Sequence, residues 1–440
     1  MTTFSVPQNF ASANAGRGGT AEIATWPLVA VLMAAPLAFG AVPSWAWAGM
    51  GIAIVVLALS GAVQRVRAGS LTLPWSPLFV PLMVALGLAL VQLLAGWSMD
   101  AAATRESAMK LAVYALAFFL ALLYFSRASA RLWRLVALAV TIYAFAVALF
   151  AMLQFFARPG LLYGIIKPRW GGYIFGPYVS HNHYAGLMEM LVPLGVGLAL
   201  TPRPRHPARP LVVFAVLISV VSVLLSGSRG GVIGLLAEFA FLTAAVFCAQ
   251  PASPERKRAL IAGFAVAFLA GASFFWLDPG GVWQRWEQLS ESRELTANMR
   301  GQVSADTLRM ADAHLARGIG LGAFAAAYPA YQTVVTDDLI DYAHNDYAQF
   351  VAEGGLAAAV LILISLPLFF RLALRRLRQR LEEPTGWLQL GAAAGVCGIL
   401  VHSLLDFNLH IPANAAWFAF CAALATLRRN PAPELDCNLP

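Results

Sequence analysis

Long apolar runs separated by short polar segments dominate the chain. Most runs approach the roughly 20 residues that an α-helix needs to cross about 30 Å of hydrocarbon. The pattern therefore predicts an all-α polytopic membrane protein with about twelve transmembrane helices. The predicted spans are residues 26–43, 45–63, 77–96, 108–125, 133–156, 183–200, 211–227, 230–249, 259–277, 348–370, 386–405 and 411–427.

Two stretches interrupt this alternation. Residues 157–182 are rich in glycine, proline and aromatic residues, and residues 278–346 are too long for a simple connector. In the long loop we expect one short helix after Pro279, with its tryptophans on one face, and another from near Ser304 to Gly318. The expected parts are a tail at 1–25, spans one to nine within 26–277, a large loop at 278–346, spans ten to twelve within 347–427, and a tail at 428–440.

Composition and charge fix the expected orientation. The chain is 60% hydrophobic and only 12% charged, which is too little charge to cover a soluble surface of this size. Its net charge of +8 could suit a nucleic acid, but most of the basic residues fall in every second short loop. Such loops are cytoplasmic in membrane proteins. We therefore expect an inner-membrane protein with both termini in the cytoplasm, an extracytoplasmic long loop, and no nucleic-acid partner.

Several basic residues fall on the opposite, outward side, where positive charge is disfavoured. An anion at the membrane surface would explain them, because arginine gives phosphate two parallel hydrogen bonds. Interfacial snorkelling is the alternative, and it suits Arg105 and Arg158 best. The outward residues beyond the long loop are Arg105, Lys110, Arg158, Lys167, Arg169 and Arg229.

Arg229 lies in the segment SGSRGG, between two predicted spans. An arginine near hydrocarbon costs about 2.5–3.5 kcal/mol on insertion scales. The flanking glycines allow close approach of a ligand, and a helix N-terminus following them would offer free N–H groups to a phosphate or pyrophosphate. A tight hairpin with an incidental cation is the alternative reading.

His344 lies where the long loop meets span ten, in the segment DYAHNDYAQFVAEGG. Asp341, Asp346 and Glu353 are its nearest carboxylates in the sequence. A histidine beside a carboxylate can accept a proton from a hydroxyl near neutral pH. A helix cap by Asn345 or Asp346 would explain the same polar residues.

Three further motifs carry less specific signals. His181 and His183 in SHNHYAG could bind a metal from an extended segment, but no third ligand accompanies them, and capping by neighbouring residues is an alternative. His402 and Asp406 share a helix face and could be functional or could hold two helices together. GIGLGAF lacks the lysine of a phosphate-binding loop. No metal and no nucleotide cofactor are expected.

Four strings together resemble the O-antigen ligase and O-antigen polymerase superfamily of bacterial membrane glycosyltransferases. They are LLSGSRGG, TLRMADAHLARGIGLGAF, HNDYAQFVAEGG and HSLLDFNLHIPANA, and the resemblance covers roughly Ser180 to Asn414. It implies a metal-independent enzyme that takes a glycan from undecaprenyl pyrophosphate on the periplasmic side. The first expectation is ligation to a sugar of lipid A core. The alternatives are an O-antigen or exopolysaccharide repeat-unit polymerase that uses a lipid-linked repeat as acceptor and, in another class, a lipid-linked oligosaccharide flippase or transporter.

The resemblance also implies roles for particular residues. His344 would help to activate the acceptor hydroxyl, and Arg229 and Arg309 would hold the pyrophosphate and stabilise the leaving group. The remaining residues expected to bind pyrophosphate or glycan are Lys167, Arg169, His181 and Asp346. Ala358 and Ile233 depart from the ligase pattern, which weakens the choice between ligase and polymerase.

Overall fold

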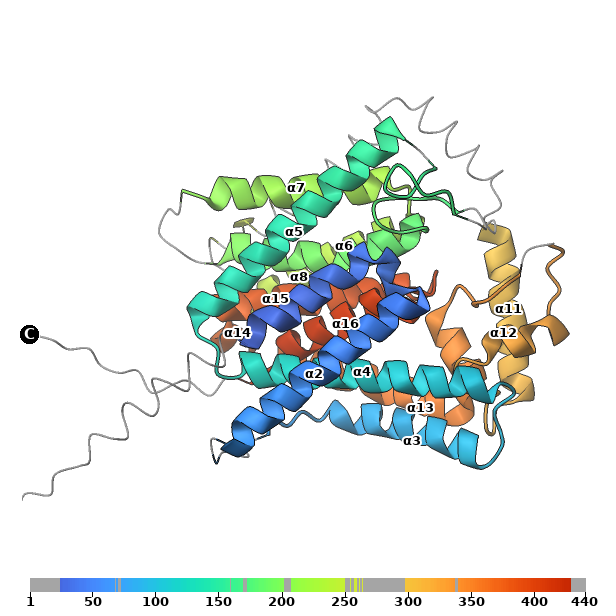
Figure 1. The fold of residues 1–440 in the computed structure, drawn as a ribbon. Helices are drawn as coiled ribbons and strands as arrows, with labels where there is room; N and C mark the ends of the chain where they lie inside the picture. Colours follow the sequence, from blue (N-terminus) through green and yellow to red (C-terminus); the bar gives the residue numbers. More distant parts are fainter. Residues whose placement is uncertain are drawn as a thin grey trace, which may run out of the picture.

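The chain folds into an elongated bundle of helices that run along one common direction (Figure 1). Within the described residues all regular structure is helical, apart from two isolated β-bridges. This agrees with the all-α prediction. The computed structural model describes residues 24–67, 69, 73–158, 160–168, 172–201, 207–249, 254, 257, 258, 261, 263, 297–336 and 339–428.

Seven of the described helices are long and apolar enough to cross a membrane. They are α2 (Ser44–Arg67), α4 (Ala101–Phe125), α5 (Ala130–Ala157), α6 (His181–Leu200), α8 (Arg229–Ala249), α13 (Asp346–Leu374) and α15 (Pro384–His402). The shorter helices beside them are Ala24–Leu37, α3 (Phe79–Leu94), α7 (Arg209–Leu225) and α16 (Pro412–Thr426). Every predicted span overlaps one of these helices, except 259–277, of which the structure describes only residues 261 and 263. The chain is a multi-pass membrane protein, and seven helices rather than twelve reach spanning length in the described part.

Helices α6 and α15 form the centre of the bundle. In the most apolar 18-residue stretch of each helix, 89% of the residues of α6 and 83% of those of α15 are buried. The corresponding share for α13, at the periphery, is 22%. Glycines allow the two helices to approach closely: a Cβ at Gly197 would lie 2.5 Å from the carbonyl oxygen of Trp387, and a Cβ at Gly391 would overlap Pro193. Contacts between small residues drive helix association where lipid is as apolar as the side chains.

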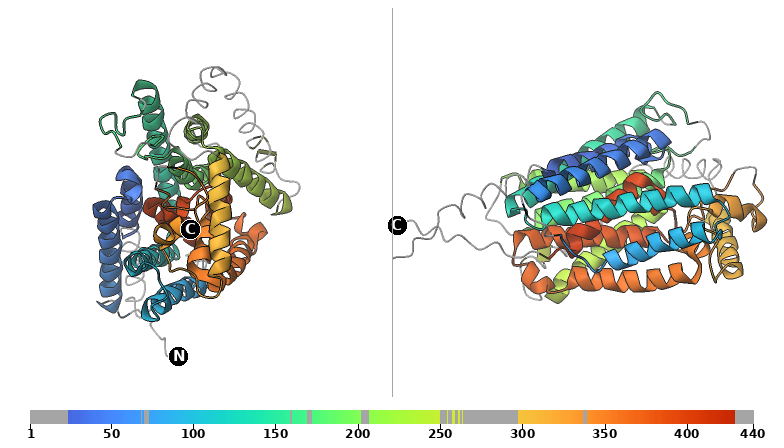
Figure 2. Two further views of the ribbon diagram at one scale, coloured as in Figure 1. Left: turned by 90° about the vertical axis from the view of Figure 1, so that its right-hand side faces the viewer. Right: turned by 60° about the horizontal axis from the view of Figure 1, so that its bottom comes forward.

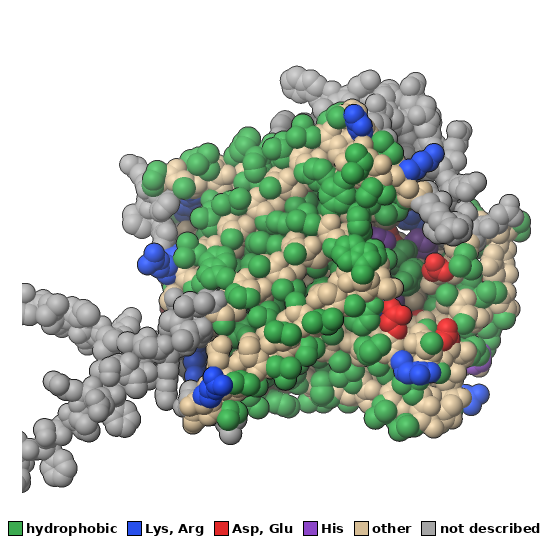
Figure 3. All heavy atoms as spheres, viewed as in Figure 1, with side chains coloured by type: hydrophobic (Ala, Val, Ile, Leu, Met, Phe, Trp, Pro, Cys, Tyr) green, Lys and Arg blue, Asp and Glu red, His purple; other side chains and the backbone are tan. Residues whose placement is uncertain are grey.

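The outside of the bundle is apolar, as expected for a lipid-facing surface (Figure 3). The basic residues lie towards its two ends. At the end opposite the long loop, Arg380 donates to the carbonyl oxygens of Ala373 and Ala425, at 2.7 Å and 2.8 Å, and so joins the last turns of α13 and α16. Part of the positive charge at this end therefore caps helix termini.

A kink in α13 anchors the glycine-rich segment that follows α11. Gly355 has φ 63° and ψ −149°, a conformation that glycine adopts readily, and this breaks the helical hydrogen-bond ladder. The carbonyls left free accept from the glycine-rich segment: Ile319 N–H donates to Ala352 at 3.1 Å, and Gly320 N–H to Glu353 at 3.0 Å. The side chain of buried Gln92 donates to Glu353 at 2.8 Å from α3. The glycine-rich segment Gly318–Gly322 thus fits into the kink.

The described part of the long loop packs as a separate layer over one end of the bundle. Its helix α11 (Ala297–Ala313) crosses the ends of the other helices in both views (Figure 1, Figure 2). The layer has its own apolar core, which includes Val303, Met310, Phe324 and Tyr328. The helix expected near Ser304 therefore exists but begins at Ala297, and the one expected after Pro279 lies outside the described residues. The short elements η1 (Phe39–Ala41), α12 (Phe324–Ala327), η2 (Tyr328–Ala330), α14 (Leu377–Arg380) and η3 (Asn408–His410) complete the described structure.

Candidate functional site

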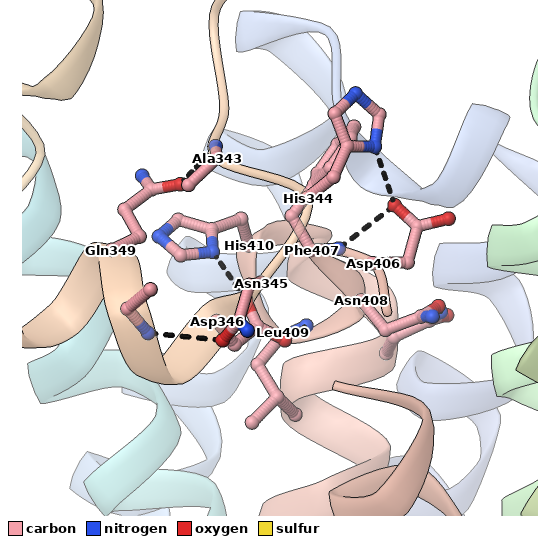
Figure 4. A network of polar contacts seen from close by, with 12 residues as sticks. Ala343, His344, Asn345, Asp346, Gln349, Asp406, Phe407, Asn408, Leu409 and His410 are labelled. Atoms are coloured by element: carbon pink, nitrogen blue, oxygen red, sulfur yellow. Dashed lines mark hydrogen bonds and ion pairs between the residues drawn. The ribbon is translucent and has the colours of Figure 1, made fainter. Parts of the chain in front are cut away.

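The candidate site is centred on a contact between His344 and Asp406. Nδ1 of His344 lies 3.3 Å from Oδ1 of Asp406, across 62 residues of sequence. Asp406 is 1% exposed, whereas the His344 side chain is 16% exposed. Nε2 of His344 points away from the surrounding polar network (Figure 4). The carboxylate thus orients the imidazole by one nitrogen and leaves the other directed outward, as in carboxylate–histidine general bases.

The charge of Asp406 is stabilised by its surroundings. Burial alone would raise the pKa of this carboxyl group, but the hydrogen bond and charge of His344, with the charges of His183 and Arg300, lower its pKa well below the ordinary value. The backbone N–H of Phe407 also donates to Oδ1 at 2.8 Å. Asp406 therefore remains a carboxylate across neutral pH and can stabilise a protonated His344.

The backbone at His344 is strained. Its φ of 51° lies in the left-handed region, which a side chain with a Cβ rarely adopts. The next residue fixes this geometry, because the Asn345 side chain accepts from Ala348 N–H at 3.0 Å and caps α13. On the other side, Ala343 N–H donates to Gln349 at 2.9 Å. The helix cap, which the sequence offered as an alternative explanation of these polar residues, is present at Asn345, and it positions the histidine.

The hairpin between α15 and α16 supplies the other half of the site. The carboxylate of Asp346, at the start of α13, accepts two hydrogen bonds from this hairpin. They come from Nδ1 of His410 at 2.6 Å and from the backbone N–H of Leu409 at 3.1 Å (Figure 4). The Asn414 side chain donates to Asn408 at 3.1 Å and to the carbonyl of His183 at 2.9 Å, which ties the hairpin to α6. Asp346 is thus engaged in holding α13 to the hairpin.

Aromatic contacts surround the ring of Phe407. Tyr342 stacks on it with ring centroids 4.3 Å apart, and His344 and His183 meet it edge-on at 4.9 Å and 4.7 Å. Phe407 therefore fixes the rotation of His344 from the side, while Asp406 fixes it from the end. On the face shown in Figure 3 the surface is hollowed towards the loop-bearing end, and histidine side chains are visible in the recess.

Arg300, on α11, adds a positive charge close to the site. Its charge acts on both His181 and Asp406. One turn along the same face, the Ser304 hydroxyl donates to the carbonyl of Ala343 at 3.3 Å, next to His344. Helix α11 is thus held against the loop that carries the histidine, and its first turns bring an arginine to the dyad.

Arg309 lies on a different face of α11. Nine residues separate it from Arg300, which at 3.6 residues per turn places the two side chains about half a turn apart. The Arg309 side chain is 59% exposed and pairs with Asp306 on its own helix. The structure therefore brings Arg300, not Arg309, to the cluster around His344.

Arg229 is exposed at the first residue of α8. The residues beside it contact the site: the Ser228 hydroxyl donates to the Asn182 side chain at 2.7 Å, and Gly230 packs against the ring of His402. Gly231 N–H donates to Ser228 at 3.0 Å. The segment SGSRGG thus joins the end of α7 to the first turn of α8, which lies beside the first turn of α6 and offers an N-terminal array of N–H groups as predicted.

Of the other predicted residues, His181 lies near the charges of the site, whereas Lys167 has no described contact with it. His181 begins α6 and meets the Tyr173 ring at 4.6 Å, within reach of the charges of Arg300 and Asp406. Lys167 is exposed in the loop before α6, and the described residues give it no hydrogen bond or ion pair. Arg169 lies outside the described residues. His181 and His183 are helical rather than extended, and among the described residues no three ligand-type side chains converge as a metal site would require.

The site combines an oriented histidine, a buried carboxylate and arginines at the loop-bearing end of a membrane bundle. Such a set can remove a proton from a hydroxyl and balance the charge of an anionic leaving group. Sequence reasoning missed Arg300, for which the only signal was its place in a polar helix, and it left Asp406 undecided. The four-residue spacing to His402 did mark Asp406, but only the fold brings it to His344.

The fold and this site define a multi-pass membrane protein with a polar cluster of side chains at one end. Residues 214–363 match the family model described as O-antigen ligase, and this match supports membership of the chain in the O-antigen ligase superfamily. The match includes Arg229, Arg300, Arg309 and His344, whereas Asp406 follows it. Members of this family are membrane enzymes of the glycosyltransferase kind. No curated protein matches the chain significantly.

Proposed function

We propose that the protein transfers a glycan from undecaprenyl pyrophosphate to a sugar hydroxyl of lipid A core, as an O-antigen ligase. The observation that carries this proposal is the His344–Asp406 contact, with Arg300 beside it and the first turn of α8 adjacent. The family match supports lipid-linked glycans as substrates. A repeat-unit polymerase of the same superfamily would use a lipid-linked repeat as acceptor, and it is an outcome of the test below.

In the proposed reaction, the acceptor hydroxyl loses its proton to Nε2 of His344 as its oxygen bonds to the anomeric carbon of the donor sugar. Asp406 stabilises the resulting imidazolium. The bond between the anomeric carbon and the pyrophosphate oxygen breaks, and undecaprenyl pyrophosphate leaves with the electron pair. Arg300, together with Arg229 and the first N–H groups of α8, balances the charge on this leaving group.

The proposed location is the bacterial inner membrane, with both termini in the cytoplasm and the site facing the periplasm. The distribution of basic residues supports this orientation, since Arg65, Arg67, Arg131 and Arg380 fall at the ends of helices opposite the His344 site. The donor's isoprenoid chain would then remain in the bilayer while its pyrophosphate reaches the arginines.

The test is a gel profile of surface glycolipids from a deletion strain that carries wild-type protein or His344→Ala. We expect bare lipid A core and carrier-linked polymer in the deletion strain, a restored ladder with wild type, and no restoration with His344→Ala. His314→Ala is the matched control, because His314 pairs with Tyr331 at 2.9 Å on the loop layer, away from the dyad. It should restore the ladder.

Each other outcome changes the assignment. Core carrying a single repeat in the deletion strain would identify a polymerase. An unchanged lipopolysaccharide with lost exopolysaccharide would move the protein to that pathway. Carrier-linked glycan trapped on the cytoplasmic side would indicate a flippase. A full ladder with His344→Ala would remove His344 from the chemistry.

A further inference from the structure

A second polar cluster lies inside the bundle, and the proposed reaction does not use it. It consists of Glu189 on α6, Glu238 on α8 and His402 at the end of α15, and each is at most 1% exposed. Nδ1 of His402 lies 2.8 Å from Oε1 of Glu189. Ionisable residues inside a membrane-spanning bundle are costly and usually functional.

Each of the three side chains packs against a glycine that leaves room for it. A methyl group at Gly230 would collide with the His402 ring, one at Gly234 would lie 2.6 Å from the Glu189 carboxylate, and one at Gly398 would collide with Glu238. Gly230, Gly234 and Glu238 follow one another at intervals of four residues along α8, which is about 6 Å per step. His402, Glu189 and Glu238 therefore form a file that starts at the first turn of α8 and leads into the bilayer.

Several buried atoms of this file have no hydrogen-bond partner among the residues that the structure describes. They are Nε2 of His402, Oε2 of Glu189 and both carboxyl oxygens of Glu238. Buried polar atoms of native proteins are normally satisfied, by protein or by water. The file is thus a place where mobile protons or water molecules complete the bonding.

Charge balance decides which groups carry protons. Two ionised carboxylates beside one imidazolium would leave a net negative charge in a low dielectric, which is strongly disfavoured. Glu189 has His402 as its cation, whereas Glu238 faces Glu189 and the thiols of Cys397 and Cys421. The charged neighbours of His402 on the outer side are Asp406 and Asp346. Glu238 is therefore the group that must retain its proton.

We propose that Glu238, Glu189 and His402 form an intramembrane proton-binding site that tunes the anion site at the first turn of α8. In this state Glu238 is a neutral acid, Glu189 is a carboxylate and His402 is an imidazolium, so the file is neutral overall. The His402 ring abuts Gly230, next to Arg229, and its Nε2–H adds positive potential behind the pyrophosphate of the donor. His402 and Glu189 are thus positioning residues, and this inference rests on the proposed function for the nature of the anion.

The first test measures the affinity of the purified full-length protein for inorganic pyrophosphate by calorimetry. Glu189→Gln removes the counter-charge of His402, so we expect affinity to fall about tenfold. Glu189→Asp keeps the charge and should recover most of that loss, which a merely structural role would not predict. Thr141→Val is the matched control, because the buried Thr141 hydroxyl donates within its own helix α5, to the carbonyl of Ala137 at 2.8 Å. Equal affinities of wild type and Glu189→Gln would overturn the coupling.

The second test reads the proton on Glu238 directly by infrared difference spectroscopy at neutral pH. The wild type should show the carbonyl stretch of a protonated carboxylic acid that is absent from Glu238→Gln, and Glu238→Asp should shift this band rather than remove it. The aspartate variant covers the case in which Glu238→Gln does not fold. The absence of any such band would overturn the proton site.

The two proposals fail differently. A wild-type protein that binds no pyrophosphate would overturn both the anion site of the proposed function and the coupling to it. A wild type that binds pyrophosphate, with Glu189→Gln binding it equally well, would overturn the coupling alone. The infrared band decides the protonation of Glu238 in either case.

Discussion

The two faces of α11 differ in what their arginines contact. Arg300 lies on the face turned to α6 and the hairpin that follows α15, where its charge acts on His181 and Asp406. Arg309 lies about half a turn away and pairs with Asp306 within the same helix. One arginine thus acts across segments distant in the sequence, and the other stabilises its own layer. The face that a cation occupies decides whether a substrate can use it.

The largest expected effect separates the two arginines directly. Arg300→Ala should lower kcat/KM for glycan transfer by about 10²–10³-fold, as expected when a charge-stabilising group is removed from a reaction site. Arg309→Ala should lower it by about fivefold or less, because exposed ion pairs contribute little. Transfer assays on purified variants with a lipid-linked glycan donor measure both. The reverse ranking would assign the pyrophosphate to the outer face of α11.

An intermediate effect is expected at Asp306, which organises the outer face. This buried carboxylate accepts from Thr333 N–H at 2.8 Å, the Thr333 hydroxyl at 2.8 Å and the Tyr328 hydroxyl at 3.0 Å, in addition to Arg309. Asp306→Asn should destabilise the loop layer by about 1–3 kcal/mol at neutral pH. Thermal unfolding in detergent measures this, with Asp312→Asn as the matched control, since Asp312 is exposed on the same helix.

The pKa of Asp306 predicts how the stability difference between wild type and Asp306→Asn depends on pH. Burial raises the pKa of Asp306, but its hydrogen bonds from Thr333, Tyr328 and Arg309 lower the pKa by more, to a net value below the ordinary one. Its contribution to stability is therefore complete above an ordinary pKa of about 4 and is lost as the pH falls through the lowered value. The gap in melting temperature between wild type and Asp306→Asn should narrow below about pH 4. A gap that instead widened with acid would contradict the assignment of charge.

The smallest expected effect tests the exposed surface of α11. Gly301 lies inside this helix, and a Cβ added there meets no atom within 4 Å. Gly301→Ala should therefore stabilise the protein by about 0.4–1 kcal/mol, chiefly by restricting the unfolded chain. A small rise in melting temperature with unchanged transfer activity is expected. A loss of activity would show that a substrate approaches the backbone at Gly301.

The helical bodies were predictable because a run of about 20 apolar residues suffices to identify a spanning helix. Their ends were not. Helix α4 begins at Ala101 rather than at residue 108, because the Asp100 side chain accepts from Ala102 and Ala103 N–H at 2.9 Å and 3.0 Å and caps a polar first turn. A hydropathy pattern does not predict where such a capped helix begins.

The candidate site was predictable only in part, for a similar reason. The local sequence around His344 shows a histidine among polar residues, and the structure agrees with that reading. Its partner Asp406 lies 62 residues away and is brought there by the packing of α13 against the last hairpin. Whether Arg300 or Arg309 faces the site depends on the rotation of α11 about its axis. The hydrogen bond from Ser304 to the Ala343 carbonyl sets this rotation, and it joins segments that are far apart in the sequence.

The left-handed backbone at His344 makes stability and catalytic activity demand different residues at this one position. At φ 51° a residue with a Cβ costs about 1–2 kcal/mol relative to glycine, and asparagine tolerates the conformation better than histidine does. Neither replacement could accept a proton from a sugar hydroxyl. Under the proposed function, selection of variants for heat resistance alone would favour the loss of this histidine, so directed evolution of the protein requires a screen for activity at every round.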